Sequence, residues 1–217
     1  MDERHLHSCI LACDFRVDDV ARMWRWLGGH HDALSSIGAH HVVLYRSIVE
    51  PGRVLVTIGI RHAASIREVL RSPAIFEWFD IAGARDIPPV FGGEVVEKID
   101  LREPGDLRET GGDEPGPDRV VVGVVSSVDD VEALMVGVHN GLDRFRSDGL
   151  RKLWVYRALD DGQEVLILQE ISDASTARRW IDHPDAAARW MNPSGVGAHP
   201  PHFVGTFADT LTVAGQG

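Results

Sequence analysis

Histidine and carboxylate side chains are the groups in this sequence that could carry acid–base chemistry. His31 stands where the helical spacing of apolar residues predicts a buried face. A histidine at such a position is either a hydrogen-bonded core residue or an acid–base group that lines a pocket. Asp14, at the end of an apolar segment, could orient a histidine, pair with Arg16, or lie in solvent beyond the strand. We therefore take His31 and Asp14 as the candidate catalytic residues.

Metal and cofactor chemistry are not predicted, although histidines are adjacent at 30–31 and at 40–41. Neighbouring residues of a helix or a strand point in different directions, so an adjacent pair is a poor chelate. Cys9 and Cys13 share one face of a predicted strand, which favours a role in the core over redox or metal chemistry. The sequence has no dinucleotide-binding or phosphate-binding glycine motif and no nucleophile elbow. We expect neither a cofactor nor a metal.

Tryptophan and glutamine side chains are the candidate ligand contacts. Trp24 and Trp78 belong to predicted helices, where they could form the walls of a flat apolar pocket. Gln169 interrupts an apolar strand whose counterpart earlier in the chain has Ile58, so we expect Gln169 to line a pocket as well. The expected ligand is a small apolar or aromatic molecule.

The elements that would position these residues occur twice in the chain. Motifs repeat at one constant spacing, which predicts a tandem duplication. The matching positions include residues 17–20 and 128–131 (VDDV), 45–46 and 156–157 (YR), and Gly38 and Gly149. The predicted repeats cover 5–101 and 118–214. Residues 102–117 are rich in glycine, proline and acidic side chains, which predicts a flexible linker.

Each repeat alternates strand and helix patterns. In the first repeat the predicted strands are 7–14, 40–48, 54–60 and 91–101, with a helix spanning Val20 to Leu34 and another over 63–71 that continues to about residue 80. The order β-α-β-β-α-β is that of the ferredoxin-like split unit. The helices can cover one face of the sheet, yet the strands are apolar on both. The predicted fold class is therefore α+β: two tandem ferredoxin-like units forming an intramolecular pseudo-dimeric α/β barrel.

Two segments of the second repeat resemble a known family. Residues 165–173 (VLILQEISD) and 180–184 (WIDHP) are similar to the third strand and second helix of the antibiotic-biosynthesis-monooxygenase-like group of the dimeric α/β barrel superfamily. The resemblance implies the barrel fold. It leaves several activities open, because such families include cofactor-free monooxygenases, haem-degrading enzymes, isomerases and proteins of no known activity.

The resemblance also implies what a haem-degrading relative would carry: an Asn on the first strand, a Trp ending the third strand and a His late in the second helix. The first strands here contain no Asn. The other aligned positions hold Ile60 and Phe79 in the first repeat, and Ile171 and Trp190 in the second. Haem degradation is therefore disfavoured.

Composition and charge exclude further classes. The 217 residues carry a formal net charge of −11, so the chain lacks the basic footprint that nucleic acids or anionic lipids require. No apolar run reaches the roughly 18–20 residues of a membrane span, and the charged N-terminus is unlike a signal peptide, so a cytoplasmic protein is expected. Two functions remain. The protein is a cofactor-independent monooxygenase or isomerase of small molecules, or a non-catalytic ligand-binding or structural protein, as a monomeric pseudo-dimer or a homodimer.

Overall fold

The computed structural model describes residues 9–72, 74–85, 87–102, 120–182 and 202–213. Within these residues the chain forms eight strands and six helices, and the strands pair antiparallel. The fold is therefore α+β, as predicted. The chain divides into two compact units: unit 1 comprises Met1–Val95 and Ala208–Gly217, and unit 2 comprises Val96–Phe207.

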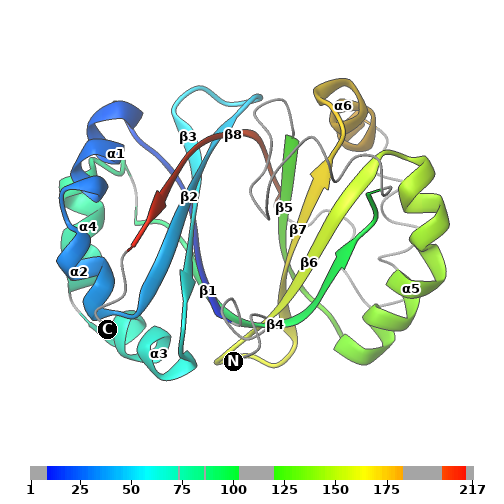
Figure 1. Ribbon diagram of the computed structural model, residues 1–217, viewed down its shortest axis with the longest axis horizontal. Helices are drawn as coiled ribbons and strands as arrows, with labels where there is room; N and C mark the ends of the chain where they lie inside the picture. Colours follow the sequence, from blue (N-terminus) through cyan, green and yellow to red (C-terminus); the bar gives the residue numbers. More distant parts are fainter. Residues whose placement is uncertain (1–8, 73, 86, 103–119, 183–201, 214–217) are drawn as a thin grey trace. The chain divides into compact units, whose positions relative to one another are not determined.

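Unit 1 carries its four helices on one side of its strands (Figure 1). Its elements in chain order are β1 (Cys9–Arg16), α1 (Val20–Gly28), α2 (His31–Ser36), β2 (Ala39–Ser47), β3 (Arg53–Ile60), α3 (Ala63–Arg71), α4 (Ala74–Ala82), the first part of β4 (Val90–Asp100) and the last part of β8 (His202–Thr212). The strand order is β4-β1-β3-β2, so β1 and β3 are the inner strands. Each strand begins and ends within two residues of its predicted range.

The first predicted helix of unit 1 is broken into two. It ends at Gly28 because Gly28 and Gly29 are residues of low helix propensity. The His30 ring donates a hydrogen bond from Nδ1 to a carbonyl of the last turn, at 2.7 Å, and so satisfies one of the acceptors that a helix end leaves open. A separate helix, α2, starts at His31. The prediction of one continuous apolar face over residues 20–34 is therefore wrong.

A β-bulge near the start of β2 changes the direction of its side chains. Gly38 turns the chain into this strand with a φ of +75°, in the left-handed region that glycine favours. The register of β2 against β3 then shifts between Ala39 and His41, which makes His40 the extra residue of a bulge. Both histidine rings consequently lie against Gly59 of β3.

Unit 2 has the strand order β6-β7-β5-β8. Its elements are the rest of β4, β5 (Val120–Ser127), α5 (Val131–Ser147), β6 (Leu150–Ala158), β7 (Glu164–Ile171), α6 (Ala174–Asp182) and the first part of β8 (His202–Thr212). The helix α5 runs unbroken and lies alongside β6 (Figure 1). A bulge between Leu150 and Lys152 falls at the position that corresponds to the bulge of β2.

Residues 9–100 and 120–212 each follow the order β-α-β-β-α-β when α1 and α2, and likewise α3 and α4, are counted together. The repeat boundaries at 5–101 and 118–214 stay predictions. The predicted linker, 102–117, lies outside the described residues except for Arg102, whose backbone and side chain hydrogen-bond to Asp100.

The inner strands are buried on both faces. All of residues 54–60 in β3 and 165–171 in β7 are buried. Helices cover one of these faces within each unit, so two-sided burial indicates a sheet that is covered on both sides. Among the described residues, no helix is long and apolar enough to cross a lipid bilayer.

Candidate ligand-binding site

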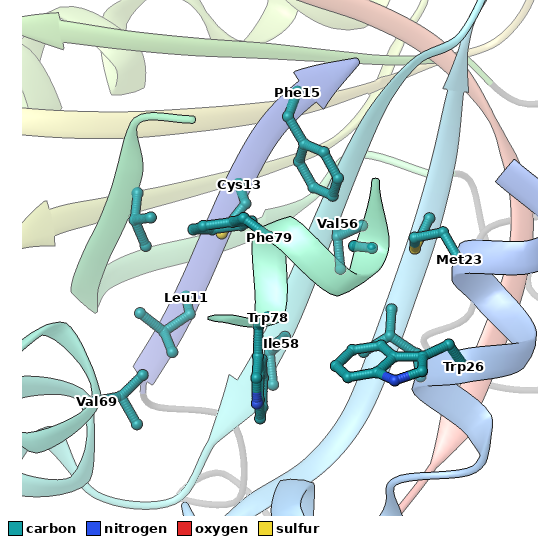
Figure 2. A pocket seen from close by; sticks show the side chains of 13 residues that line it. Leu11, Cys13, Phe15, Met23, Trp26, Val56, Ile58, Val69, Trp78 and Phe79 are labelled. Carbon is teal, nitrogen blue, oxygen red and sulfur yellow. The ribbon is translucent and has the colours of Figure 1, made fainter. Parts of the chain in front are cut away.

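Unit 1 contains an apolar pocket between its sheet and the helices α1, α3 and α4, with a cavity volume of about 50 Å³ (Figure 2). Its lining residues are apolar side chains and one thiol: Leu11, Cys13, Phe15, Met23, Trp26, Leu27, Val56, Ile58, Val69, Trp78, Phe79, Ala82 and Val90. An aromatic-rich apolar pocket of this kind suits the apolar part of a small molecule.

Strand alternation explains the floor of the pocket. Successive side chains of a strand point to opposite faces, so Leu11, Cys13 and Phe15 of β1 share the face that looks toward the helices. Val56 and Ile58 of β3 share it too, since the register pairs Cys13 with Val56 and Leu11 with Ile58. The floor therefore follows from the register of the two inner strands.

Helical spacing explains the walls. Met23, Trp26 and Leu27 lie three and four residues apart on α1, so they share one face. Trp78 of α4 meets Trp26 edge to face, with ring centroids 6.1 Å apart. Figure 2 shows both indole rings reaching into the pocket from their separate helices. These contacts fix α1 and α4 as the walls.

Cys13 is the titratable side chain in this lining. Burial, and in second place the neighbouring Asp14 charge, raises the pKa of the Cys13 thiol to about 12. The thiol therefore stays protonated at neutral pH and is a poor nucleophile, because the thiolate is the reactive form. The thiol of the lining is therefore poorly suited to acid–base or nucleophilic catalysis near neutral pH.

A second pocket of about 400 Å³, whose lining mixes apolar and polar side chains, shares two lining residues with the apolar pocket. Its lining residues come from α2, α3, the residue that follows each of these helices, and α4: Ala33, Ser36, Ile37, Ser65, Glu68, Val69, Ser72 and Trp78. Val69 and Trp78 line both pockets. We call the 50 Å³ pocket the inner pocket and the 400 Å³ pocket the outer pocket.

His31 lines neither pocket. It is exposed at the first position of α2. The predicted position on a buried face is wrong, because the break at the Gly28 and Gly29 pair starts a new helix with a different phase. The catalytic role of His31 stays a prediction, although the buried position that suggested this role is not observed.

Asp14 is held by Arg53 rather than by a histidine or by Arg16. Arg53 Nε donates to Asp14 Oδ1 at 2.8 Å, and Nη2 donates to Oδ2 at 2.6 Å. Arg53 and Arg16 both also pair with Glu50. Hydrogen bonds from Arg16, together with those from Arg53, lower the pKa of Glu50, and the bond to Asp14 is the main reason that the pKa of Arg53 is raised. This cluster ties β1 to the β2–β3 turn, and the catalytic role of Asp14 stays a prediction.

The predicted ligand contacts divide into one that lines a described pocket and two that do not. Trp78 lines both pockets, whereas Trp24 lines neither. Trp26 takes the place expected of Trp24. The sequence could have identified Trp26, because it follows Met23 by three residues and therefore shares a helix face with it. Gln169 is buried in β7 of unit 2 and belongs to neither of these pockets.

The adjacent histidines of β2 contradict the expectation that they would point apart. The bulge brings their rings together, with His40 Nδ1 and His41 Nδ1 2.7 Å apart in a hydrogen bond. A side chain at position 59 would collide with both rings, so Gly59 makes the pairing possible. Within the described residues, no three or more His, Cys, Asp or Glu side chains are grouped so that they could hold a metal ion.

The same bulge in β6 carries a different set of residues. Arg151 and Lys152 take the places of the histidines, and Glu170, the register partner of Lys152, takes the place of Gly59. Glu170 and Lys152 are buried. The exchange of all three residues was visible in the sequence alignment of the predicted repeats, but the alignment did not show that a bulge makes Lys152 the register partner of Glu170.

Comparison with known proteins identifies the fold. No family model and no curated protein matches the sequence. Solved structures match over nearly the whole chain. An anthrone oxidase-like protein has a TM-score of 0.64 at 13% identity, covering 95% of this chain and 94% of its own. A candidate monooxygenase from Fusobacterium nucleatum has a TM-score of 0.56 at 9% identity, covering 96% of each chain.

A haem-binding protein from Thermus thermophilus has a TM-score of 0.51 at 17% identity, covering 93% of this chain and 92% of its own. At these identities the likeness concerns the fold, not the activity. The chain therefore shares its fold with monooxygenase-like proteins, as the sequence resemblance led us to expect.

Proposed function

We propose that unit 1 is a small-molecule-binding module whose inner pocket takes the apolar part of its ligand. The observation that carries the proposal is the apolar lining between helices and sheet, which includes the aromatic rings of Phe15, Trp26, Trp78 and Phe79. Pockets of this composition gain affinity from removing apolar ligand surface from water. The similarity in fold to an anthrone oxidase-like protein and a haem-binding protein supports an organic ligand.

Titration of ¹⁵N-labelled protein with 1-hexanol, followed by amide chemical shifts, tests this proposal. We expect saturable shifts confined to β1, β3, α1 and α4. The variant Ala82→Leu enlarges a lining side chain and should weaken binding, because the inner pocket has little free volume. Ala133→Leu, on the exposed side of α5, is the control and should bind like the wild type. Chemical-shift changes scattered over both units, or no changes at all, would refute a ligand-binding site in unit 1.

A second candidate is a cofactor-independent monooxygenase or isomerase. It is favoured by Glu68, a carboxylate in the outer pocket that is placed to take a proton from a ligand reaching across Trp78. Oxygen uptake with anthrone as the probe tests it: anthrone and O₂ give anthraquinone and water. Glu68→Gln should abolish uptake and Glu77→Gln, on the exposed side of α4, should not. Equal rates with and without protein would exclude this reaction for anthrone.

Haem does not fit the inner pocket. The cavity of about 50 Å³ is too small for a porphyrin, and the lining offers no histidine and no cation for the propionates. Its thiol is not available as a thiolate ligand near neutral pH, since its pKa is about 12. Ile60 and Phe79, at the positions where haem-degrading relatives carry Trp and His, are buried apolar side chains.

We further propose that the chain is a tandem duplication of one ferredoxin-like unit, and that the two copies form an intramolecular pseudo-dimeric α/β barrel. The matching element order, the equivalent bulges and the two-sided burial of β3 and β7 support this. A protease site inserted within residues 102–117 tests it. After cleavage the two fragments should co-elute at the mass of the intact chain, and separation of the fragments would contradict the pseudo-dimer.

A further inference from the structure

We propose that the inner and outer pockets form one bipartite site for an amphipathic molecule with a protonated amine. The apolar end lies in the inner pocket and the ammonium group lies beside Glu68 in the outer pocket. This inference rests on the proposed function and adds the chemical class of the ligand.

The two pockets meet at shared residues. Val69 of α3 and Trp78 of α4 contribute to both linings. Trp78 is half-buried, and its side chain belongs to both linings. A side chain that borders both spaces is the natural divider between them. A ligand long enough to pass Trp78 would therefore touch both linings.

The volumes of the two pockets indicate which part of the ligand each pocket can hold. The inner pocket, at about 50 Å³, has room for only a short alkyl end or the edge of a ring. The outer pocket, at about 400 Å³, falls within the size range of ordinary small-molecule sites, roughly 300–1,000 Å³. Most of the ligand therefore belongs in the outer pocket, and its apolar end is anchored in the inner one.

The polar groups of the outer pocket set the chemistry of the other end. Among its lining residues, Glu68 is the charged one, and Ser36, Ser65 and Ser72 supply hydroxyl groups. A carboxylate and hydroxyls accept hydrogen bonds from an ammonium group, whereas Glu68 repels an anion. Arg67 and Arg71 are on the same helix as Glu68 but belong to neither lining. The lining thus favours a cationic end over a neutral end and disfavours a carboxylate.

Three probes of six carbon atoms each test the inference: hexylamine, 1-hexanol and hexanoate. Dissociation constants are measured by amide chemical-shift titration at pH 7. Because Glu68 is exposed and screened by solvent, we expect hexylamine to bind about threefold more tightly than hexanol. Hexanoate should bind more weakly than hexanol. Glu68→Gln should make hexylamine and hexanol equal and leave hexanol unchanged.

Glu77→Gln is the matched control, because Glu77 is an exposed carboxylate of the neighbouring α4 that lines neither pocket. It removes the same charge from the protein and should preserve the preference for hexylamine. A preference lost equally in both variants would show a general charge effect and overturn the role of Glu68. Hexanol binding in unit 1 without any preference for the amine would overturn the bipartite site alone. Absence of hexanol binding would overturn the proposed function itself.

Discussion

Asp14 illustrates how the partner of a carboxylate decides its role. Its side chain is 28% exposed, and both of its oxygens accept hydrogen bonds from Arg53. Paired hydrogen bonds between a guanidinium and a carboxylate are strong because both groups are charged and their planar geometries match. Asp14 and Arg53 therefore join β1 to β3 near the β2–β3 turn.

The first prediction concerns this pair. Asp14→Asn leaves one good acceptor and removes the charge, so we expect a loss of about 2 kcal/mol in the free energy of unfolding. Urea denaturation measures it, and binding of hexanol to the folded variant should be unchanged. A variant as stable as the wild type but unable to bind ligand would contradict the structural role and restore the functional one.

The second prediction concerns the cysteines. Cys9 and Cys13 are buried, and burial raises the pKa of Cys13 to about 12. Native protein at pH 8 should therefore react very slowly with a thiol-specific reagent such as dithionitrobenzoate, and both thiols should react at once in denaturant. Rapid labelling of the native protein would show that the inner pocket is open to solvent and reagent.

At the scale of elements, the bulge at the start of β2 determines which side chains meet. A Cβ atom at position 59 would lie 2.6 Å from His40 Cε1 and closer still to His41. The third prediction is that Gly59→Ala lowers the free energy of unfolding by about 1–3 kcal/mol, as overpacking does. Gly28→Ala is the control, because nothing lies within 4 Å of its Cβ position. Equal stability of the two variants would show that the histidine pair adapts without cost.

The fourth prediction concerns the start of α6. Hydrogen bonds from the Ser175 side chain, the Thr176 backbone and the Thr176 side chain lower the pKa of Asp173 from its ordinary value of 3.8. The folded state thus binds this proton less readily than the unfolded state. The resulting stability is present above pH 3.8 and is lost as the pH falls toward the lowered folded-state pKa.

Asp173→Asn keeps an acceptor at this helix start but removes the titration. Its unfolding free energy should therefore fall less steeply below about pH 4 than that of the wild type, as measured by urea midpoints across pH. Asp143→Asn, on the exposed surface of α5, is the control and should keep the acid dependence of the wild type. If the unfolding free energy of Asp173→Asn fell with pH as steeply as that of the wild type, this role for Asp173 would be contradicted.

Periodicity predicted the strands well, because strand alternation and helical spacing depend on local sequence alone. It failed at α1, where Gly28 and Gly29 break the helix while the apolar spacing continues, and His31 was consequently placed on a buried face. It also failed at His40 and His41, since a bulge depends on pairing with a distant strand. The sequence suggested Trp24 and Trp78 as pocket walls, but Trp26 could be distinguished from Trp24 only once the phase of α1 was known.

At the scale of the whole molecule, the two proposed repeats differ at several positions that line the inner pocket of unit 1. The repeat spacing aligns Phe15 with Ser126 and Trp26 with Gly137. It also aligns the apolar lining residue Ile58 with Gln169. At these positions unit 2 lacks the rings and gains a buried amide. If the chain is the duplication that we propose, divergence of this kind is expected when one copy keeps a ligand pocket and the other does not, and it favours unit 1 as the binding unit.

The binding of an apolar group inside unit 1 is the central claim, and isotope-filtered nuclear Overhauser spectroscopy with 1-hexanol tests it most directly. The fifth prediction is that the terminal methyl of hexanol gives cross-peaks to the side chains of Met23, Val56 and Ile58, which line the inner pocket. Cross-peaks at saturating hexanol that involve only side chains outside this lining would contradict the account.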